Sequence, residues 1–514
     1  MKPLGAILLL MAGGTWLLSG CAAVRPDRAL AVATGLISHN LCAAVFVTGL
    51  DAEQAYAESL APRPGMGVIN WAVHYDVDRV HGEIRTTVAG GFESRAVFRD
   101  RLGCTVVRGA APEDSSVPKD AAVDDAASLA ALPEIAGPAV VEPSDERLRQ
   151  ALDRAFWEPD HPPYRWTKAV VIVHDGRVVA ERYAPGYEVN TPLLGYSATK
   201  SVMSALVGIL VRQGRLTVDQ PAPVAAWSHP DDPRHKLTID NLLRMTSGLA
   251  VDETDSPLSP VARMLYLERD MAGYAESLGL EAPPGSRWNY TSGNTLIVSR
   301  IIRDAVGGDA TEVLRFAHGE LFAPLGMRNV TLEFDSSGTP VGSTYMLAPA
   351  RDWARFGMLY LNDGVVGGRR ILPEGWVRYS TTPTLDTGYG AGFWTNRVAG
   401  HIPWSAVLWS IPGAPRDSFY ARGLLGQYVV VVPSERLVIA RFGVSHGRGA
   451  DIEGVGQLVA DTIDAVNSAA STQHPAPRTN SYRTRFPSDA VMRCSAAEQS
   501  FGSRCTSRIE KPST

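Results

Sequence analysis

The chain has 514 residues, of which 45% are hydrophobic and 20% are charged, and its formal net charge is -5. This composition is ordinary for a globular protein with a large core, and the length suggests two to four domains or one large domain with attachments. No run of like charge stands out. That argues against nucleic-acid binding, which needs clustered positive charge.

The N-terminus has the pattern of a secretion signal. Lys2 is followed by an apolar run over residues 6–18 and then by the sequence Leu-Ser-Gly-Cys ending at Cys21. The run is too short to span a bilayer and fits the apolar part of a signal peptide. Leu-Ser-Gly-Cys resembles the bacterial lipobox, which implies removal of residues 1–20 and acylation of Cys21. The alternative is a plain signal peptide cut elsewhere.

These features predict a protein of the bacterial cell envelope that is lipid-anchored and faces the periplasm, in the outer membrane. No later stretch is expected to cross a bilayer, so the membrane is a partner only through the N-terminal lipid. Lipidation leaves Cys42, Cys104, Cys494 and Cys505. In an oxidising compartment these permit two disulfides in three connectivities, of which the nearest-neighbour one is Cys42–Cys104 with Cys494–Cys505. Free buried thiols are the alternative.

The sequence divides into regions of different character. Residues 21–108 form a first region of open role, in which residues 73–80 and 84–90 alternate as strands do. Residues 109–145 are rich in Ala, Pro, Asp and Glu and are expected to be a linker. Residues 468–514 are polar and are expected to be a disordered tail.

The main domain is expected over residues 146–467. It begins with a hairpin at 168–184, continues with helical patterns from 197 to 325, and returns to a hairpin at 426–444 before a helix at 450–467. Strands at both ends with helices between them predict an α+β fold. We expect an antiparallel sheet flanked by helices, with an inserted helical subdomain.

The sequence Ser-Ala-Thr-Lys at 197–200 is an S-x-x-K motif. On a helix, positions i and i+3 share a face, so the two polar side chains can meet. A serine hydroxyl is a weak nucleophile until a base takes its proton, and burial makes a lysine a better base. The apolar run 201–213, closed by Gly214, supplies a buried helix. We therefore predict Ser197 as the nucleophile of a serine hydrolase and Lys200 as its base.

Other interpretations of this motif come from the sequence itself. Ser197 could merely cap the helix. A second S-x-x-K, from Ser116 to Lys119, lies in the expected linker and contains a proline, so chance explains it. A nucleophile elbow, G-x-S-x-G, begins at Gly195 but has Thr199 where the second glycine belongs.

Two later segments could complete the site. Tyr290 lies in a loop two residues before Ser292 and could relay protons to a leaving group, with a packing tyrosine as the alternative. The segment Ala-Arg-Gly-Leu at 421–424 enters a strand. A strand edge beside the nucleophile can offer a backbone N–H to an oxyanion, and Gly423 would allow close approach of substrate. The alternative is an ordinary strand start.

The order and spacing of these segments resemble the serine β-lactamase-related family, in particular its branch of class C β-lactamases, esterases and 6-aminohexanoate-dimer hydrolases. The resemblance covers roughly residues 165–446 and implies a β-lactamase/transpeptidase-like fold. It is carried by an ordered series that includes YSATKSVMSALVGILVRQGRL, LTIDNLLRMTSGL, PPGSRWNYTSGN, ARDWARFGMLYLNDG and ARGLLGQYVVVVPSERLVIARFG.

The resemblance implies roles for individual residues. Ser197 would be the acylated nucleophile, Lys200 the base and Tyr290 the proton relay. The backbone N–H groups of Ser197 and Leu424 would form the oxyanion hole, and Ser292 stands where the family usually has Asn.

The third motif of the family is usually Lys-Thr-Gly or His-x-Gly. Here Ala421 takes the Lys or His place and Gly423 matches. In the family that Lys or His helps to hold the carboxylate of β-lactams, which Ala421 cannot do. Arg422 is adjacent, but successive side chains on a strand face opposite ways. We therefore expect penicillins and cephalosporins to be poor substrates, unless an arginine from another loop fills the gap.

The leading functional interpretation is hydrolysis of a small-molecule ester or amide through a Ser197 acyl-enzyme. The alternatives are a cell-wall D-Ala peptidase and a catalytically idle binding or sensor protein. The Trp-bearing stretch 393–409 is expected to shape the pocket. No cofactor is expected. No metal is expected either, because His-Glu-x-x-His and Cys-x-x-Cys do not occur in the sequence.

Overall fold

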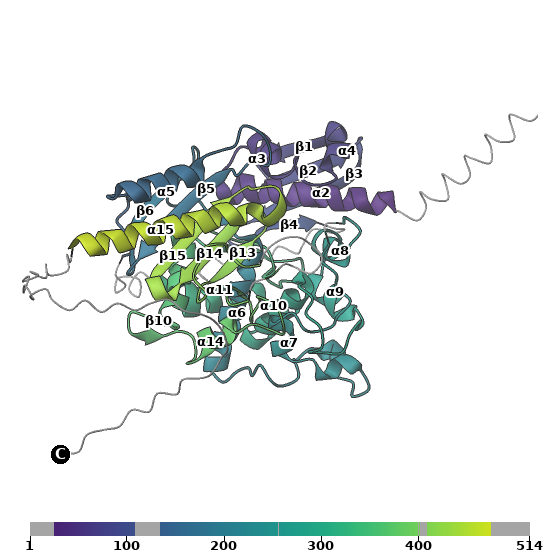
Figure 1. Cartoon of the computed structure of the whole chain (residues 1–514). Coiled ribbons are helices and arrows are strands. Elements are labelled where there is room, and N and C mark those ends of the chain that lie inside the picture. Colours follow the sequence, from purple (N-terminus) through teal and green to yellow (C-terminus); the bar gives the residue numbers. More distant parts are fainter. Residues whose placement is uncertain (1–24, 108–133, 255, 399, 401–408, 474–514) are drawn as a thin grey trace, which may run out of the picture. The chain divides into compact units, whose positions relative to one another are not determined.

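The computed structural model of the chain describes residues 25–107, 134–254, 256–398, 400 and 409–473 (Figure 1). Several predicted features lie outside the described residues: the signal peptide and Cys21, the second S-x-x-K motif, Cys494 and Cys505, and residues 401–408 of the Trp-bearing stretch.

A six-stranded antiparallel sheet forms the centre of the main domain, as the sequence predicts. Both expected hairpins are present, and the later one turns through a 3-10 turn at Pro433–Glu435. The strands, in their order across the sheet, are β12 (Trp394–Thr395), β13 (Phe419–Gly423), β14 (Gln427–Val432), β15 (Leu437–Gly443), β5 (Thr167–His174) and β6 (Arg177–Tyr183). The α+β fold class is thereby confirmed.

The central strands are covered on both faces, which explains their continuous runs of apolar residues. Val171 and Val173 of β5 face a core formed with the helical subdomain, whereas Val170 and Ile172 face a second core. Residues of α5 (Glu146–Phe156) and α15 (Ile452–Gln473) belong to the second core, and α13 (Ala350–Leu361) packs on the first face.

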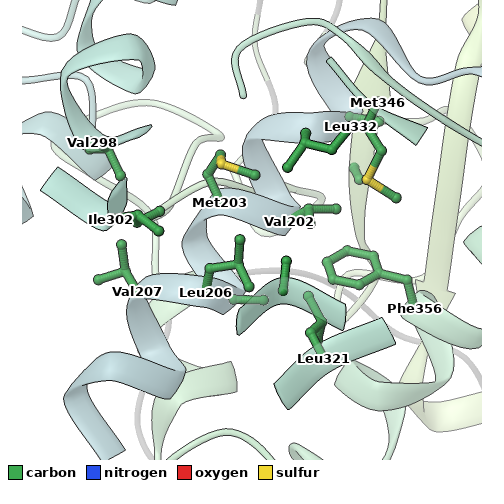
Figure 2. Packing of buried hydrophobic residues seen from close by; sticks show 14 of the residues in the cluster. Val202, Met203, Leu206, Val207, Val298, Ile302, Leu321, Leu332, Met346 and Phe356 are labelled. Atoms are coloured by element: carbon green, nitrogen blue, oxygen red, sulfur yellow. The ribbon is translucent and has the colours of Figure 1, made fainter. Parts of the chain in front are cut away.

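Helix α6 (Thr199–Arg212) lies in the middle of the first core. Figure 2 shows its side chains, among them Val202 and Leu206, surrounded by apolar residues of other elements. The helix is buried along nearly its whole length and is followed by Gly214 with φ +69°, as its expected cap. The other helices here include α7 (Ile239–Leu243), α8 (Pro260–Leu267), α9 (Met271–Ser277), α10 (Ser292–Val306), α11 (Ala310–Ala317), α12 (Ala323–Leu325) and α14 (Trp376–Thr381).

The region before the main domain is a helix packed on a second antiparallel sheet. The sheet has the order β1 (Val73–Asp78), β2 (Glu83–Val88), β3 (Gly91–Arg99) and β4 (Gly103–Val107). β1 and β2 confirm the strands predicted at 73–80 and 84–90, whereas β3 and β4 were not predicted. The helical elements are α2 (Pro26–Cys42), a π-helical turn η1 (Ala43–Thr48), α3 (Ala52–Ser59) and α4 (Met66–Ile69). We call residues 26–107 the N-terminal region.

Helix α2 was not predicted from the sequence. It contacts β2, β3, β4 and α8. Together with η1 it corrects the expectation that no later stretch could cross a bilayer: Pro26–Thr48 has the length and hydropathy of a membrane span. In the folded chain 67% of the apolar window is buried inside the protein, so it serves as a core helix.

A disulfide joins the end of α2 to β4. The bond links Cys42 to Cys104 and closes a loop with a sequence separation of 62, which confirms that half of the nearest-neighbour pairing. Beside it, the backbone N–H of Cys104 donates to Glu333 of the main domain over 2.8 Å, and the other oxygen of that carboxylate lies 2.9 Å from His39 Nε2. The N-terminal region is therefore fastened to the main domain by buried polar contacts.

The described end of the expected linker, residues 134–145, lies along the edge strand β6. Val178 and Glu181 of that strand donate backbone hydrogen bonds to the carbonyls of Ile135 and Val141, over 2.9 and 3.0 Å. The segment thus covers the polar backbone edge of the sheet, which would otherwise be open to pairing with another chain.

Candidate active site

Ser197 lies in a single 3-10 turn, η5 (Tyr196–Ala198), that leads directly into α6. Its Oγ accepts a hydrogen bond from Lys200 Nζ over 2.9 Å. Ser197 is partly exposed, whereas Lys200 is only 2% exposed. The hydroxyl can therefore be reached by a substrate while the amine beside it is shielded from water.

Lys200 Nζ is held by two further acceptors. It donates to the Ser292 hydroxyl over 3.2 Å and to the Ser343 carbonyl over 2.9 Å. A lysine has three N–H donors when charged, and these three contacts use them all. Loss of one proton would leave a lone pair directed at Ser197 Oγ, because the other two acceptors fix the orientation of the amine. The cluster thus fits an amine that takes the serine proton.

Tyr290 lies next to the same amine, in the loop before α10. Lys200 Nζ is 5.0 Å from the centre of the Tyr290 ring. The ring packs against Trp394, Tyr389 and Trp288, with centroid distances of 5.5, 5.6 and 6.3 Å. An aromatic wall therefore surrounds the tyrosine, and one Trp of the stretch expected to shape the pocket belongs to it.

Glu253 joins this cluster although the sequence analysis did not identify it. The backbone N–H and the hydroxyl of Ser292 both donate to its carboxylate, the hydroxyl over 3.1 Å. A polar chain thus runs from Lys200 through Ser292 to Glu253. The glutamate lies 39 residues before Ser292 and no local period relates the two, so only the fold brings them together.

Strand β13 closes the other side of the candidate site. A Cβ atom on Gly423 would lie 2.1 Å from the carbonyl oxygen of Gly195, two residues before the nucleophile. The approach of substrate at this glycine stays a prediction, and the structure adds a close approach made by the chain's own backbone. The absence of a side chain lets β13 lie against η5. Leu424 directly follows the strand and is 51% exposed.

Ala421 and Arg422 lie on opposite faces of β13, as strand geometry predicts. Ala421 is buried in the first core. Arg422 donates to the carbonyl of Gly449 over 3.0 Å and stacks on the Tyr428 ring, with a distance of 5.6 Å to its centre. Its guanidinium is therefore engaged away from the face that carries Ala421 and Gly423.

The backbone at Tyr196, immediately before the nucleophile, is unusual. Its φ is +46°, in the left-handed region that side-chain-bearing residues rarely adopt. Such a conformation costs a non-glycine residue about 1–2 kcal/mol, so its surroundings must hold it.

Within the described residues, no group of three or more His, Cys, Asp or Glu could hold a metal ion.

Comparisons with known proteins identify a family. The sequence matches the beta-lactamase family over residues 167–455. The 6-aminohexanoate-dimer hydrolase of Paenarthrobacter ureafaciens is 25% identical over 297 residues, which cover 54% of this chain and 72% of the relative.

Among solved structures, a penicillin-binding protein homolog from Caulobacter crescentus is similar with a TM-score of 0.48 and 17% identity, over 65% of this chain and 100% of that one. A family VIII carboxylesterase is similar with a TM-score of 0.48 and 16% identity, over 64% of this chain and 99% of that one. The N-terminal region lies before residues 167–455, which match the family.

Proposed function

This chain belongs to the beta-lactamase family, and we propose that it cleaves small esters or amides through an acyl-enzyme formed on Ser197. The observation that carries the proposal is the 2.9 Å contact between the amine of the buried Lys200 and the hydroxyl of the partly exposed Ser197. A serine needs such a base to act as a nucleophile. The relative from Paenarthrobacter, whose name denotes a hydrolase of a short linear amide, supports the substrate class.

We propose the following sequence of steps. Ser197 Oγ attacks the carbonyl carbon of the substrate while its proton passes to Lys200 Nζ. The backbone N–H groups of Ser197 and Leu424 bind the oxyanion. The proton reaches the leaving group through Tyr290, the bond to that group breaks, and the acyl group stays on Oγ. Water then attacks the acyl carbon, its proton returns to Ser197 Oγ through the same groups, and the acid is released.

Labelling with a fluorophosphonate tests the nucleophile. Wild-type protein should gain one adduct, and peptide mass spectrometry should locate it on Ser197. The Ser197→Ala variant should not be labelled, whereas Ser434→Ala, which removes an exposed serine from the turn between β14 and β15, should be labelled at the wild-type rate. An adduct on any other residue would sink the assignment.

We also propose that the protein is exported and anchored through a lipid on Cys21. The Leu-Ser-Gly-Cys sequence supports this, as does the Cys42–Cys104 disulfide, since disulfides persist in oxidising compartments. The Cys21→Ala variant should move from the membrane fraction to the soluble fraction when cells are fractionated. If it still sediments wholly with membranes, the anchor is elsewhere.

A further inference from the structure

The strained residue before the nucleophile is held by the N-terminal region. The Tyr196 hydroxyl donates to Asn40 Oδ1 of α2 over 3.3 Å and accepts from Arg63 Nη2 over 3.1 Å. The Arg63 guanidinium also lies 6.0 Å from the centre of the Tyr196 ring. Both partners come from residues outside the family match, so the main domain does not supply these two bonds.

The two partners are themselves fixed in place. Arg63 Nε donates to the carbonyl of Ser59 over 2.9 Å, and the Asn40 amide donates to the carbonyl of Leu36 over 2.9 Å. The hydrogen bonds therefore run in one direction, from Arg63 through Tyr196 to Asn40. A hydroxyl has one proton to donate, and this arrangement uses it together with one acceptor site.

The N-terminal region is also anchored on either side of this contact. Lys168 of β5 forms a 2.8 Å ion pair with Glu58, in which the lysine side chain is 8% exposed. The carbonyl of Glu58 lies 2.6 Å from His446 Nε2, in the loop after β15. Together with Glu333, these contacts place the segment that carries Arg63 at a fixed position against the main domain.

A cavity of about 80 Å³ borders the tyrosine, so its side chain is not packed on every side. Asn40, Leu41 and Leu60 of the N-terminal region line this cavity together with Tyr196 and Leu425. Leu425 also has a left-handed backbone, with φ +61°, and it follows Leu424. Each candidate oxyanion-hole residue thus has a strained neighbour that borders the same cavity.

We propose that the N-terminal region is a positioning element for the active site. Through Asn40 and Arg63 it holds Tyr196 in its left-handed conformation, which sets the direction of the Ser197 side chain and backbone N–H. The inference rests on the proposed function, in which Ser197 is the nucleophile. Asn40, Arg63 and Tyr196 act through the position of Ser197 and do not contact the reacting atoms.

Tyr196→Phe tests the proposal because it removes both hydrogen bonds and keeps the ring. We expect kcat for p-nitrophenyl butyrate to fall about tenfold with KM within twofold, since misplaced reacting groups slow chemistry without weakening binding. Tyr379→Phe is the matched control, because it removes a hydroxyl that donates to Asp240 over 2.7 Å in the helical subdomain. The Tyr379→Phe variant should keep kcat within twofold of the wild-type value. An unchanged kcat in folded Tyr196→Phe overturns the proposal.

A double-mutant cycle with Arg63→Ala separates positioning from other roles. Arg63 is only half-buried, so its removal should leave the protein folded. If Arg63 acts through the Tyr196 hydroxyl, Arg63→Ala should lower kcat about threefold in the wild type and not at all in Tyr196→Phe. Arg63→Lys should restore part of the loss. Additive effects, or a rise in KM with unchanged kcat, would show that Arg63 acts independently or binds substrate, and would overturn the proposal.

Fluorophosphonate labelling distinguishes this inference from the function on which it rests. If Ser197 is the nucleophile, Tyr196→Phe should still be labelled on Ser197, about tenfold more slowly than wild type. Labelling on another residue in both proteins would refute the proposed function itself. Labelling on Ser197 at equal rates in both would refute only the role of the N-terminal region.

Discussion

The main domain and the N-terminal region contribute to the candidate site in different ways. In the main domain, Ser197 and Lys200 lie three residues apart on one helical turn, so their contact follows from a local period. The N-terminal region reaches the same turn through Arg63 and Asn40, which lie 133 and 156 residues before Tyr196. The comparison shows that local spacing reveals the reacting groups, whereas the groups that hold them depend on the fold.

Removal of Lys200 tests what the main domain contributes to the site, and it has the largest expected effect. Lys200→Ala should lower kcat/KM for p-nitrophenyl butyrate by about 10²–10⁴, because general-base catalysis contributes a factor of that size. Lys236→Ala, which removes an exposed lysine in a 3-10 turn, is the control and should leave the rate unchanged. A Lys200→Ala variant within threefold of wild type would contradict the role of the base.

Removal of the Cys42–Cys104 disulfide tests how firmly the N-terminal region is held. The double variant Cys42→Ala/Cys104→Ala should lower the free energy of unfolding by about 4 kcal/mol, since the bond closes a loop with a sequence separation of 62. Urea unfolding followed by circular dichroism measures the change. At temperatures where the variant stays folded, Ser197 should still be labelled. A loss below 1 kcal/mol would mean that the noncovalent contacts of α2 already fix this region.

Substrate preference tests the expected effect of Ala421 on strand β13. The loss of one charge-assisted contact at Ala421 should cost about 1.5–3 kcal/mol, or roughly tenfold to over a hundredfold in kcat/KM for substrates that need it. Nitrocefin should therefore be hydrolysed more slowly than p-nitrophenyl butyrate by the same preparation. Faster turnover of nitrocefin would mean that another residue holds the carboxylate.

The smallest expected effect is the pH dependence at His446, where the two regions meet. Burial lowers the pKa of His446, the hydrogen bond with the Glu58 carbonyl opposes this, and the charge of Arg63 lowers the pKa further. The folded protein therefore binds fewer protons there than the unfolded chain. The contribution of His446 to the free energy of unfolding should therefore be fully present above about pH 6.5, and it should decrease as the pH falls below that value.

His446→Gln checks this prediction, because an amide can still donate to the Glu58 carbonyl and does not titrate. The free energy of unfolding of the variant, measured by urea denaturation between pH 5 and pH 7.5, should depend less on pH than that of the wild type. Parallel curves for the two proteins would show that other groups cause the dependence.

The sequence was sufficient for the features that local signals mark. The hairpins 168–184 and 426–444 were predicted from apolar runs on either side of a turn, the alternation at 73–80 from a period of two, and the helix after Ser197 from the apolar run that follows the S-x-x-K motif; the structure has all of them. Helix α2 is largely buried, as α6 is, but no catalytic motif marks its start. Glu253, Arg63 and Asn40 were missed because their partners are set by tertiary contacts.

Helix α2 and the turn after it have a consequence for biogenesis. Residues 26–48 begin only a few positions after the predicted signal peptide, and they have the length and hydropathy of a membrane span. On the export route proposed above, their release into an aqueous compartment requires that the sheet β1–β4 and α8 cover them soon after translocation. Mutations that slow the folding of this sheet should therefore divert the chain into the membrane as a misinserted protein, before its active site has formed.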